Sequence, residues 1–257
     1  MPKVSVIIPT HNRPELLKRA VASVEAQTYR DFELIVIEDI DSKGGGWARN
    51  QGIKKAQGKF IAFLDDDDEW LPEKLAVQMA VFEDTQDDVG FCFSSVINVY
   101  DGREETTRVP EGIREYTRFG LEGFKFFLNV TLLIKKFVLD DVGVFDESFP
   151  SHQESDLIIR VTRKYKGLGI NQPLVRVSMT GADKVGQDLT RRIAGRMMII
   201  DKYAAEFQKH PDILARHYDD IGFWYKKMQK YDLAKQIFKK AFMTSFSLRR
   251  LYRYVRN

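Results

Sequence analysis

The stretch Lys59-Phe-Ile-Ala-Phe-Leu64 and the residues that follow it, Asp65-Asp-Asp-Asp-Glu-Trp70, decide how this chain is interpreted. Five consecutive apolar residues after Lys59 predict a buried strand of a parallel sheet. Five carboxylates then stand together, and like charges in contact destabilise one another. A divalent cation bound with a phosphate ligand would relieve the repulsion, and hard oxygen ligands suit Mg²⁺ or Mn²⁺. The alternative is a solvated acidic turn before the helix expected from Pro72.

The composition is that of an ordinary globular protein, with 257 residues of which 44% are hydrophobic and 30% charged. A single cysteine, Cys92, excludes a disulfide framework and a cysteine-based zinc site. The N-terminus leads into a strand and not into a signal peptide, and no apolar run reaches the roughly 20 residues that span a bilayer. We therefore expect a cytoplasmic protein.

The net charge of +3 conceals two parts of opposite sign. Residues 176–257 hold 18 Lys+Arg against 8 Asp+Glu, which gives +10, and residues 1–175 hold 22 against 29, which gives −7. A change of charge along the chain fits a change of domain. We predict one domain over residues 1–180 and a basic helical extension over residues 181–257.

Strand and helix alternate three times with short links in the N-terminal part of the chain. The predicted strands of this part cover residues 3–9, 32–37 and 59–64. Asn12 is placed to cap the first helix, with Glu15 at the spacing of a capping box and Pro14 in the first turn. Such alternation predicts an α/β fold in which helices flank a mostly parallel sheet.

Later segments continue the same pattern and then change character. Further strands are predicted at residues 89–100, 130–134 and 168–177, and a helix is expected after Glu154. From about Leu189 the spacing of apolar residues is helical, and the stretch from Ile221 to Ala241 resembles one helix-turn-helix unit of the tetratricopeptide type. We therefore expect a C-terminal extension that is α-helical throughout.

Six motifs stand out in the first 160 residues: VSVIIPTHNR (4–13), ARNQG (48–52), AQG (56–58), FLDDDDEWLPEK (63–74), VGVFDE (142–147) and ESDLIIR (154–160). Together they resemble family 2 of the glycosyltransferases, the inverting GT-A group that uses nucleotide-sugar donors. They occur in the family's order over about 160 residues of the chain. The resemblance implies a Rossmann-like GT-A fold and transfer of a sugar from a nucleotide-diphosphate donor.

The resemblance assigns donor binding to the segments that follow the first three strands. The implied nucleotide-sugar-binding residues are Pro9, Thr10, His11, Asn12, Asp39, Arg49, Asp65 and Asp66. Asp39 would read the edge of the base, and Arg49 would approach the base or the diphosphate. Where the family usually has two aspartates and a Gly-Ser run, this chain has Glu38-Asp39-Ile40-Asp41, which leaves the base open although a UDP-sugar is expected. An ion pair from Arg49 to Asp39 or Asp66 is the alternative function of this arginine.

Within the acidic stretch, alignment with the family makes Asp65-Asp66-Asp67 the DXD motif. Asp66 would face the donor ribose. Asp67 would hold Mn²⁺ or Mg²⁺, directly or through water, with Asp65 close by. Asp68 is expected to be a helix-entry carboxylate or to support its neighbours, because acids are favoured in the first turn of a helix whatever their function.

Inverting transfer also needs a base that takes the proton of the acceptor hydroxyl. The resemblance places Glu154 at the family's acidic base, where Asp is more usual, and Asp156 is the second candidate. Both could instead be acids that complement the dipole of a helix N-terminus. The segment from Val142 to Glu147 would form part of the acceptor wall, with Asp146 touching acceptor hydroxyls.

The segment from Lys226 to Asn257 holds 10 Lys+Arg against one acid, Asp232, together with aromatic and aliphatic residues. This mixture suits either a solvated helical face packed on the enzyme domain or the anionic surface of a bilayer, where some relatives find lipid-linked acceptors. In the second case the protein would work at the inner face of the membrane. A nucleic-acid partner is not expected, because no recognisable binding module accompanies the basic residues.

Two classes of function remain from the sequence. The first is a metal-dependent glycosyltransferase acting on a glycan or a lipid-linked acceptor. The second is a non-catalytic nucleotide-sugar-binding or scaffold protein on the same fold. A nucleotidyltransferase would need a basic glycine-rich loop after the first strand, and neither the Rossmann fingerprint nor the P-loop motif is present.

Overall fold

The computed structural model describes residues 1–122, 129–180 and 188–256. It forms two compact units, one of Met1–Glu147 with Asp156–Ala182 and one of Ser148–Ser155 with Asp183–Asn257. The predicted domain boundary between residues 180 and 181 borders on residues 181–187, which lie outside the described residues. Unlike the predicted extension, the second unit includes a stretch from the middle of the chain, residues 148–155.

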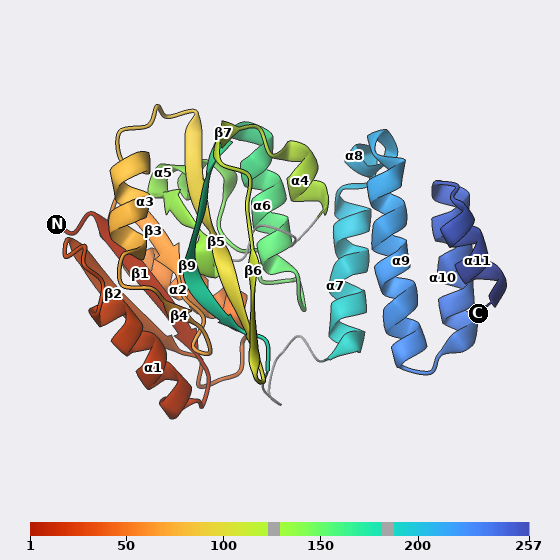
Figure 1. Cartoon of the computed structure of the whole chain (residues 1–257), viewed down its shortest axis with the longest axis horizontal. Coiled ribbons are helices and arrows are strands. Elements are labelled where there is room, and N and C mark those ends of the chain that lie inside the picture. Colours follow the sequence, from red (N-terminus) through yellow and green to blue (C-terminus); the bar gives the residue numbers. More distant parts are fainter. Residues whose placement is uncertain (123–128, 181–187, 257) are drawn as a thin grey trace. The chain divides into compact units, whose positions relative to one another are not determined.

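The first unit is an α/β structure in which helices flank one sheet (Figure 1). Its strands are β1 (Val4–Thr10), β2 (Phe32–Glu38), β3 (Phe60–Phe63), β4 (Glu69–Trp70), β5 (Val89–Tyr100), β6 (Arg103–Thr107), β7 (Gly112–Arg114), β8 (Leu133–Lys135) and β9 (Lys166–Ser178). Its helices are α1 (Pro14–Glu25), α2 (Gly45–Lys55), α3 (Lys74–Phe82), α4 (Thr117–Glu122), the short 3-10 helix η1 (Asn129–Thr131), α5 (Lys136–Val142) and most of α6 (Gln153–Lys164).

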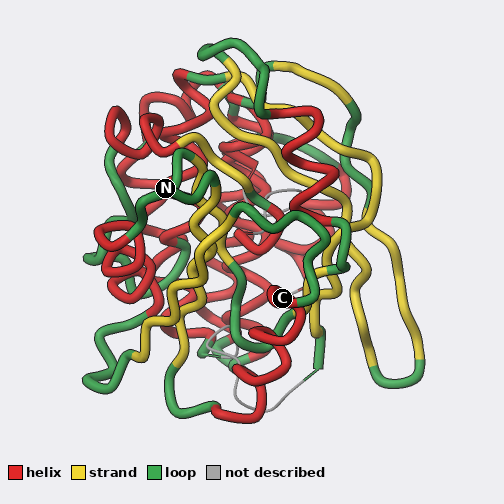
Figure 2. The backbone as a smooth tube through the Cα atoms, turned by 90° about the vertical axis from the view of Figure 1, so that its left-hand side faces the viewer, coloured by secondary structure: helices red, strands yellow, loops and turns green. Residues whose placement is uncertain are grey.

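The sheet has the strand order β2-β1-β3-β8-β5-β9-β4, with β6 added beside β5 and β7 beside β9. Strand β1 lies between β2 and β3 and runs parallel to both, and β5 runs parallel to β9. Strands β8 and β4 pair antiparallel with their neighbours. The backbone trace in Figure 2 shows these strands in yellow among the helices in red. The predicted α/β fold with helices on a Rossmann-like sheet is confirmed, and the antiparallel strands make the sheet mixed.

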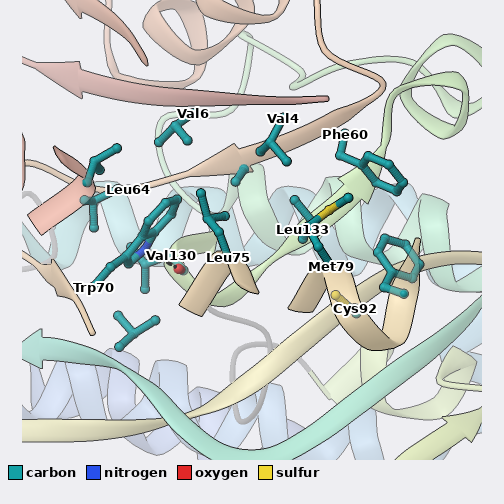
Figure 3. Packing of buried hydrophobic residues seen from close by; sticks show 14 of the residues in the cluster. Val4, Val6, Phe60, Leu64, Trp70, Leu75, Met79, Cys92, Val130 and Leu133 are labelled. Carbon is teal, nitrogen blue, oxygen red and sulfur yellow. Dashed lines mark hydrogen bonds between the residues drawn. The ribbon is translucent and has the colours of Figure 1, made fainter. Parts of the chain in front are cut away.

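Two hydrophobic clusters cover the two faces of the sheet, because side chains alternate along each buried strand. On β1, Val4, Val6 and Ile8 join the cluster that contains residues of α1 and α3. Ile7 joins the other cluster, which contains residues of α2, α5 and α6. Figure 3 shows part of the first cluster, where the indole nitrogen of Trp70 donates a hydrogen bond of 2.9 Å to the carbonyl of Val130.

Two local predictions differ from the structure, and one strand was not predicted. Asn12 does not cap α1: the N-cap is Arg13, without a side-chain cap, and Asn12 has a φ of 52°. The strand predicted at residues 130–134 is η1 followed by the short β8. Strand β4 was not predicted, because two residues are too few to show a periodic pattern.

The second unit is helical, as predicted for the C-terminal part of the chain (Figure 1). Its helices are α7 (Leu189–Lys202), α8 (Ala204–Lys209), α9 (Pro211–Lys227), α10 (Tyr231–Thr244) and α11 (Leu248–Arg256). Gly222 lets α9 approach α10 closely, because a Cβ at this position would stand 2.6 Å from the Phe238 ring. None of the helices in the described ranges is both long and apolar enough to cross a membrane.

A buried lysine lies in the first cluster of the first unit. The side chain of Lys74 is fully buried, and its Nζ stands 2.6 Å from Gln78 Oε1 and 3.9 Å from the centre of the Trp70 ring. Gln78 in turn donates to the carbonyl of Thr131 at 2.8 Å. Burial disfavours the charged amine and lowers the pKa of Lys74 to about 7.

This pKa predicts that stability rises with pH above neutrality. Folded Lys74 loses its proton near pH 7 and the unfolded lysine only near its ordinary value of 10.5. The unfolded state therefore binds more protons between these values, and the free energy of unfolding gains at most about 1.4 kcal/mol per pH unit there. Urea unfolding from pH 7 to pH 8.5 should show this gain for the wild type and not for Lys74→Met. Parallel pH profiles of the two proteins would contradict the prediction.

Candidate active site

The carboxyl ends of three neighbouring strands define the candidate site. Strands β1, β2 and β3 are parallel, so their carboxyl ends lie at the same edge of the sheet. Ligands of open α/β sheets usually bind outside this edge. The segments that follow the strands are the Pro9–Asn12 loop, Asp39 and the acidic stretch from Asp65. The structure thus brings together at one edge the segments to which donor binding was assigned.

The first two aspartates of the acidic stretch each contact positive or donating groups. Asp65 accepts a hydrogen bond of 2.6 Å from Arg49 of α2. Asp66 is buried and accepts from the Thr10 hydroxyl at 2.8 Å and from Arg13 at 3.2 Å. Burial raises the pKa of the Asp66 carboxyl, and the contacts with Thr10 and Arg13 act in the opposite direction.

The remaining acids of the stretch lie in separate environments. Asp68 is buried and accepts the backbone N–H of Ser178 at 2.9 Å, which joins the acidic stretch to the end of β9. Glu69 pairs with Arg19 at 2.9 Å near the surface, and Asp67 is half-buried. Asp68 is not a helix-entry residue, since α3 begins at Lys74. The protein's own donors therefore already offset part of the negative charge of the acidic stretch.

Asp39 shapes the loop between β2 and α2. Its carboxylate is buried and accepts the backbone N–H groups of Lys43 at 2.8 Å and Gly44 at 2.6 Å. Its backbone carbonyl accepts a hydrogen bond of 2.6 Å from Nδ1 of His11. These contacts fix the His11 ring and the start of α2. Reading of a base by Asp39 stays a prediction, and it would have to use the lone pairs that the two N–H groups leave.

Arg49 occupies a buried position in α2. Its guanidinium carbon lies 5.6 Å from the centre of the Phe145 ring, an arrangement typical of a cation–π contact. A Cβ on Gly45 would stand 3.1 Å from Nη1 of Arg49, so the glycine leaves space for the guanidinium. Asp65, which the sequence analysis did not consider as a partner, pairs with Arg49. Arg49 therefore stands beside the first carboxylate of the acidic stretch.

Asn50 is a residue that the sequence analysis did not single out. Its side-chain amide donates to the carbonyl of Phe145 at 2.9 Å and to Glu147 at 2.7 Å, and its oxygen accepts the N–H of Phe145 at 3.0 Å. These bonds tie α2 to the segment that contains Asp146, which is half-buried. The signal for Asn50 was its place beside Arg49 in the motif at 48–52.

Arg160 and Asp156 form a second clamp on the same segment. Arg160 donates to the carbonyls of Val142, Gly143 and Val144 at 2.7, 2.8 and 2.7 Å. Its Nη2 and Nε stand 2.8 and 2.9 Å from Oδ2 of Asp156, whose side chain is fully buried. The geometry is that of a structural ion pair. Because of its burial and this ion pair, the Asp156 carboxylate is poorly placed to contact an acceptor.

The residues just before Asp156 are held by the C-terminal helices of the second unit. The Ser151 hydroxyl donates to the carbonyl of Arg191 in α7 at 3.0 Å, and the buried ring of His152 stacks on Trp224 of α9 at 6.1 Å. His152 has a φ of 64°, which is unusual for a residue other than glycine. Glu154 follows, half-buried, in the first turn of α6. The segment that leads to the predicted base is thus fixed by side chains about 40 to 70 residues later in the sequence.

The acidic stretch offers oxygen ligands for a metal ion. Among the described residues, no group of three or more His, Cys, Asp or Glu side chains is arranged to hold an ion. Mg²⁺ commonly binds through one or two carboxylates together with substrate phosphates and water. Asp65, with its side chain 36% exposed, and the half-buried Asp67 provide such oxygens, whereas Asp66 is occupied by Thr10 and Arg13. The residues therefore fit a cation that is bound jointly with a diphosphate.

Comparison with known proteins gives a consistent family. The model of the family described as Glycosyl transferase family 2 matches residues 5–44 and 40–148. The amylovoran biosynthesis glycosyltransferase AmsB of Erwinia amylovora is 28% identical over 212 residues, which are 68% of this chain and 69% of AmsB. The Escherichia coli UDP-Glc:alpha-D-GlcNAc-diphosphoundecaprenol beta-1,3-glucosyltransferase WfgD is 35% identical over 101 residues, 30% of this chain and 40% of WfgD. The chain spans 59% and 38% of two other curated relatives.

Solved structures share the fold at low sequence identity. The crystal structure of S. aureus TarS 1–349 in complex with UDP-GlcNAc matches with a TM-score of 0.67 and 16% identity, over 99% of this chain and 79% of that chain. The mannosyltransferase PcManGT from Pyrobaculum calidifontis, in complex with GDP-Man and Mn²⁺, matches with a TM-score of 0.53 and 14% identity, over 98% of this chain and 78% of that chain. At these identities the likeness shows the GT-A fold alone.

The clamp predicts a structural role for Asp156. Arg160→Met leaves a fully buried carboxylate without its guanidinium and should lower the free energy of unfolding by about 3–5 kcal/mol. The double variant Asp156→Leu/Arg160→Met should lose less than the single Arg160→Met, because the buried charge is removed as well. Urea unfolding of the wild type and the single and double variants measures both. A double variant that is less stable than Arg160→Met would show that Asp156 stabilises the fold by other contacts.

Proposed function

Because the chain belongs to glycosyl transferase family 2, whose members are nucleotide-sugar-dependent enzymes, we propose that it moves a sugar, with inversion, from a UDP-sugar to a hydroxyl of a glycan or lipid-linked acceptor. One observation carries the proposal: Arg49 contacts Asp65 of the DXD motif at the edge where β1, β2 and β3 end. That arrangement offers a guanidinium and carboxylates together, which a diphosphate and its cation require. The relatives named for amylovoran biosynthesis and for an undecaprenol-linked acceptor support a role in polysaccharide assembly.

On the donor side, each group has a distinct task in this proposal. Pro9, Thr10, His11 and Asn12 line the base and ribose, and Asp39 reads the base from the next strand. Asp66, oriented by Thr10 and Arg13, accepts hydrogen bonds from the ribose hydroxyls. Arg49 turns its planar guanidinium to the diphosphate, since it can bind phosphate oxygens in pairs. The UDP-GlcNAc bound to TarS and the UDP-Glc in the name of WfgD favour uridine as the base.

A divalent cation, Mn²⁺ or Mg²⁺, would be held by Asp67 and Asp65 together with the donor diphosphate. When bound, it stabilises the negative charge on the departing nucleoside diphosphate. Arg49 adds positive charge at the same place from the protein itself. The Mn²⁺ in the PcManGT complex supports a metal in this family's fold.

On the acceptor side, Glu154 takes the proton from the attacking hydroxyl. Of the two candidates it is the better base, because Asp156 is fully buried and paired with Arg160 whereas Glu154 is half-buried. Asp146 would bind acceptor hydroxyls from the segment that Asn50 and Arg160 fix. Because these contacts hold the segment at residues 142–147 in place, less entropy is lost when the acceptor is positioned against it.

Donor binding is tested by Asp67→Ala. Isothermal titration of the wild type with UDP should show binding that is much tighter with Mn²⁺ than without it. Asp67→Ala should lose the Mn²⁺-dependent part, because the cation then lacks a ligand. Asp101→Ala, in the exposed turn between β5 and β6, is the matched control and should bind as the wild type does. Equal UDP binding with and without Mn²⁺ in the wild type would remove the metal from the proposal.

The base is tested by Glu154→Gln. This variant should bind UDP normally and lose transfer by roughly 10²–10⁴-fold, the usual share of a general base. Sugar transfer from each UDP-sugar to lipid-linked and free glycan acceptors measures the loss. Full activity of Glu154→Gln would refute the assignment and make Asp156 the next candidate. UDP binding by the wild type without hydrolysis or transfer from any donor would point instead to a non-catalytic nucleotide-sugar-binding protein.

A further inference from the structure

Helix α11 differs from an ordinary surface helix, because two of its arginines are largely buried and several of its apolar side chains are exposed. Its Arg250 and Arg253 point inward and pair with Asp219 of α9, each at 2.9 Å. The three side chains are 12%, 22% and 10% exposed, so the ion pairs are largely withdrawn from water. On most surface helices the charged residues face solvent and the apolar residues face the core. In α11, two arginines contribute to the inner contact together with Tyr254, whose ring stacks on Phe242 of α10 at 6.2 Å.

Three of the apolar residues of α11 face outward, whereas Leu251 and Tyr254 are half-buried. Leu248, Tyr252 and Val255 are 76%, 57% and 68% exposed, and their spacing of four and three residues places them on one face of the helix. Two further exposed side chains precede them in the sequence, Met243 at 73% and Phe246 at 68%. These five residues are called the outer apolar face below. Exposed apolar side chains that are clustered mark an interaction site more often than single, scattered ones do.

Basic residues accompany the outer apolar face. Lys235 and Lys239 are exposed on α10 and stand eight and four residues before Met243, along the same side of the helix. Other exposed basic residues of the segment are Lys227, Lys230, Lys240 and Arg249. Within the described part of the chain, none of these six forms an ion pair with an acid, in contrast to Arg250 and Arg253. The segment that carries the outer apolar face therefore also carries positive charge that no acid of the described residues neutralises by an ion pair.

We propose that the outer apolar face docks on an anionic lipid bilayer, with the apolar side chains at the headgroup boundary and the lysines against lipid phosphates. Large apolar side chains beside Lys and Arg are what interfacial helices use. The centre of a protein–protein interface is depleted in lysine, which disfavours a protein partner. A second copy of the chain would bring two basic faces together, and their repulsion opposes such a dimer.

The docking does not depend on the proposed reaction and is measured without donor or acceptor. The full chain is sedimented with vesicles of phosphatidylcholine alone and of phosphatidylcholine mixed with phosphatidylglycerol. The wild type should bind the anionic vesicles at least about tenfold more tightly than the neutral ones, and added salt should weaken this binding. Equal binding to both vesicles, or binding to neither, would overturn the proposal whatever the enzyme's activity proves to be.

Two sets of variants locate the surface. Leu248→Ser/Tyr252→Ser/Val255→Ser should lower vesicle affinity at least about tenfold. Lys235→Glu/Lys239→Glu should lower it and flatten its dependence on salt. Val81→Ser/Ile113→Ser, at exposed apolar positions of α3 and β7, is the matched control and should bind like the wild type. All changed side chains are exposed, and thermal unfolding checks each fold. Unchanged vesicle binding by the triple variant, or a vesicle-free dimer that the triple variant abolishes, would contradict the proposal.

Discussion

The compensation of charge at the end of β3 is the constraint on which the site depends. A buried strand delivers a run of aspartates to the edge of the sheet, and the segments after β1 and within α2 meet it with Thr10, Arg13 and Arg49. The aspartates thereby have different environments: Asp66 is buried and paired with Thr10 and Arg13, whereas the side chain of Asp65 is 36% exposed. Carboxylates that are adjacent in the sequence can therefore have different functions: a buried carboxylate is held in a fixed orientation, and a partly exposed one can bind a ligand.

The acceptor side depends on contacts between distant segments. Asn50 and Arg160 fix the segment from 142 to 147 from two helices, by hydrogen bonds to its backbone. The residues that lead to Glu154 are packed with the C-terminal helices through Ser151 and His152. The segment Ser148–Ser155, which leads to the proposed base, therefore belongs to the same compact unit as the C-terminal helices.

Much of the fold could be predicted from the sequence, because long apolar runs and helical spacing are local signals. Strands β1, β2, β3 and β5 and the C-terminal helices follow such signals closely. Strand β4 and the true cap of α1 could not be predicted, because pairing with β9 and the left-handed turn at Asn12 are set by the rest of the fold. For the site, the acidic motif identified the aspartates as candidates. The pairing of Arg49 with Asp65 and the burial of Asp156 could not be predicted, because they depend on side chains that folding brings together.

The central claim is that the carboxylates at the end of β3 and Arg49 bind a nucleoside diphosphate together with a cation. A crystal structure of the protein grown with UDP and Mn²⁺ tests it most directly, because Mn²⁺ is located by its anomalous signal. The account predicts one Mn²⁺ between the diphosphate and the side chains of Asp65 and Asp67, with Arg49 in contact with phosphate oxygens. A nucleotide bound elsewhere, or a Mn²⁺ site that involves neither aspartate, would contradict it.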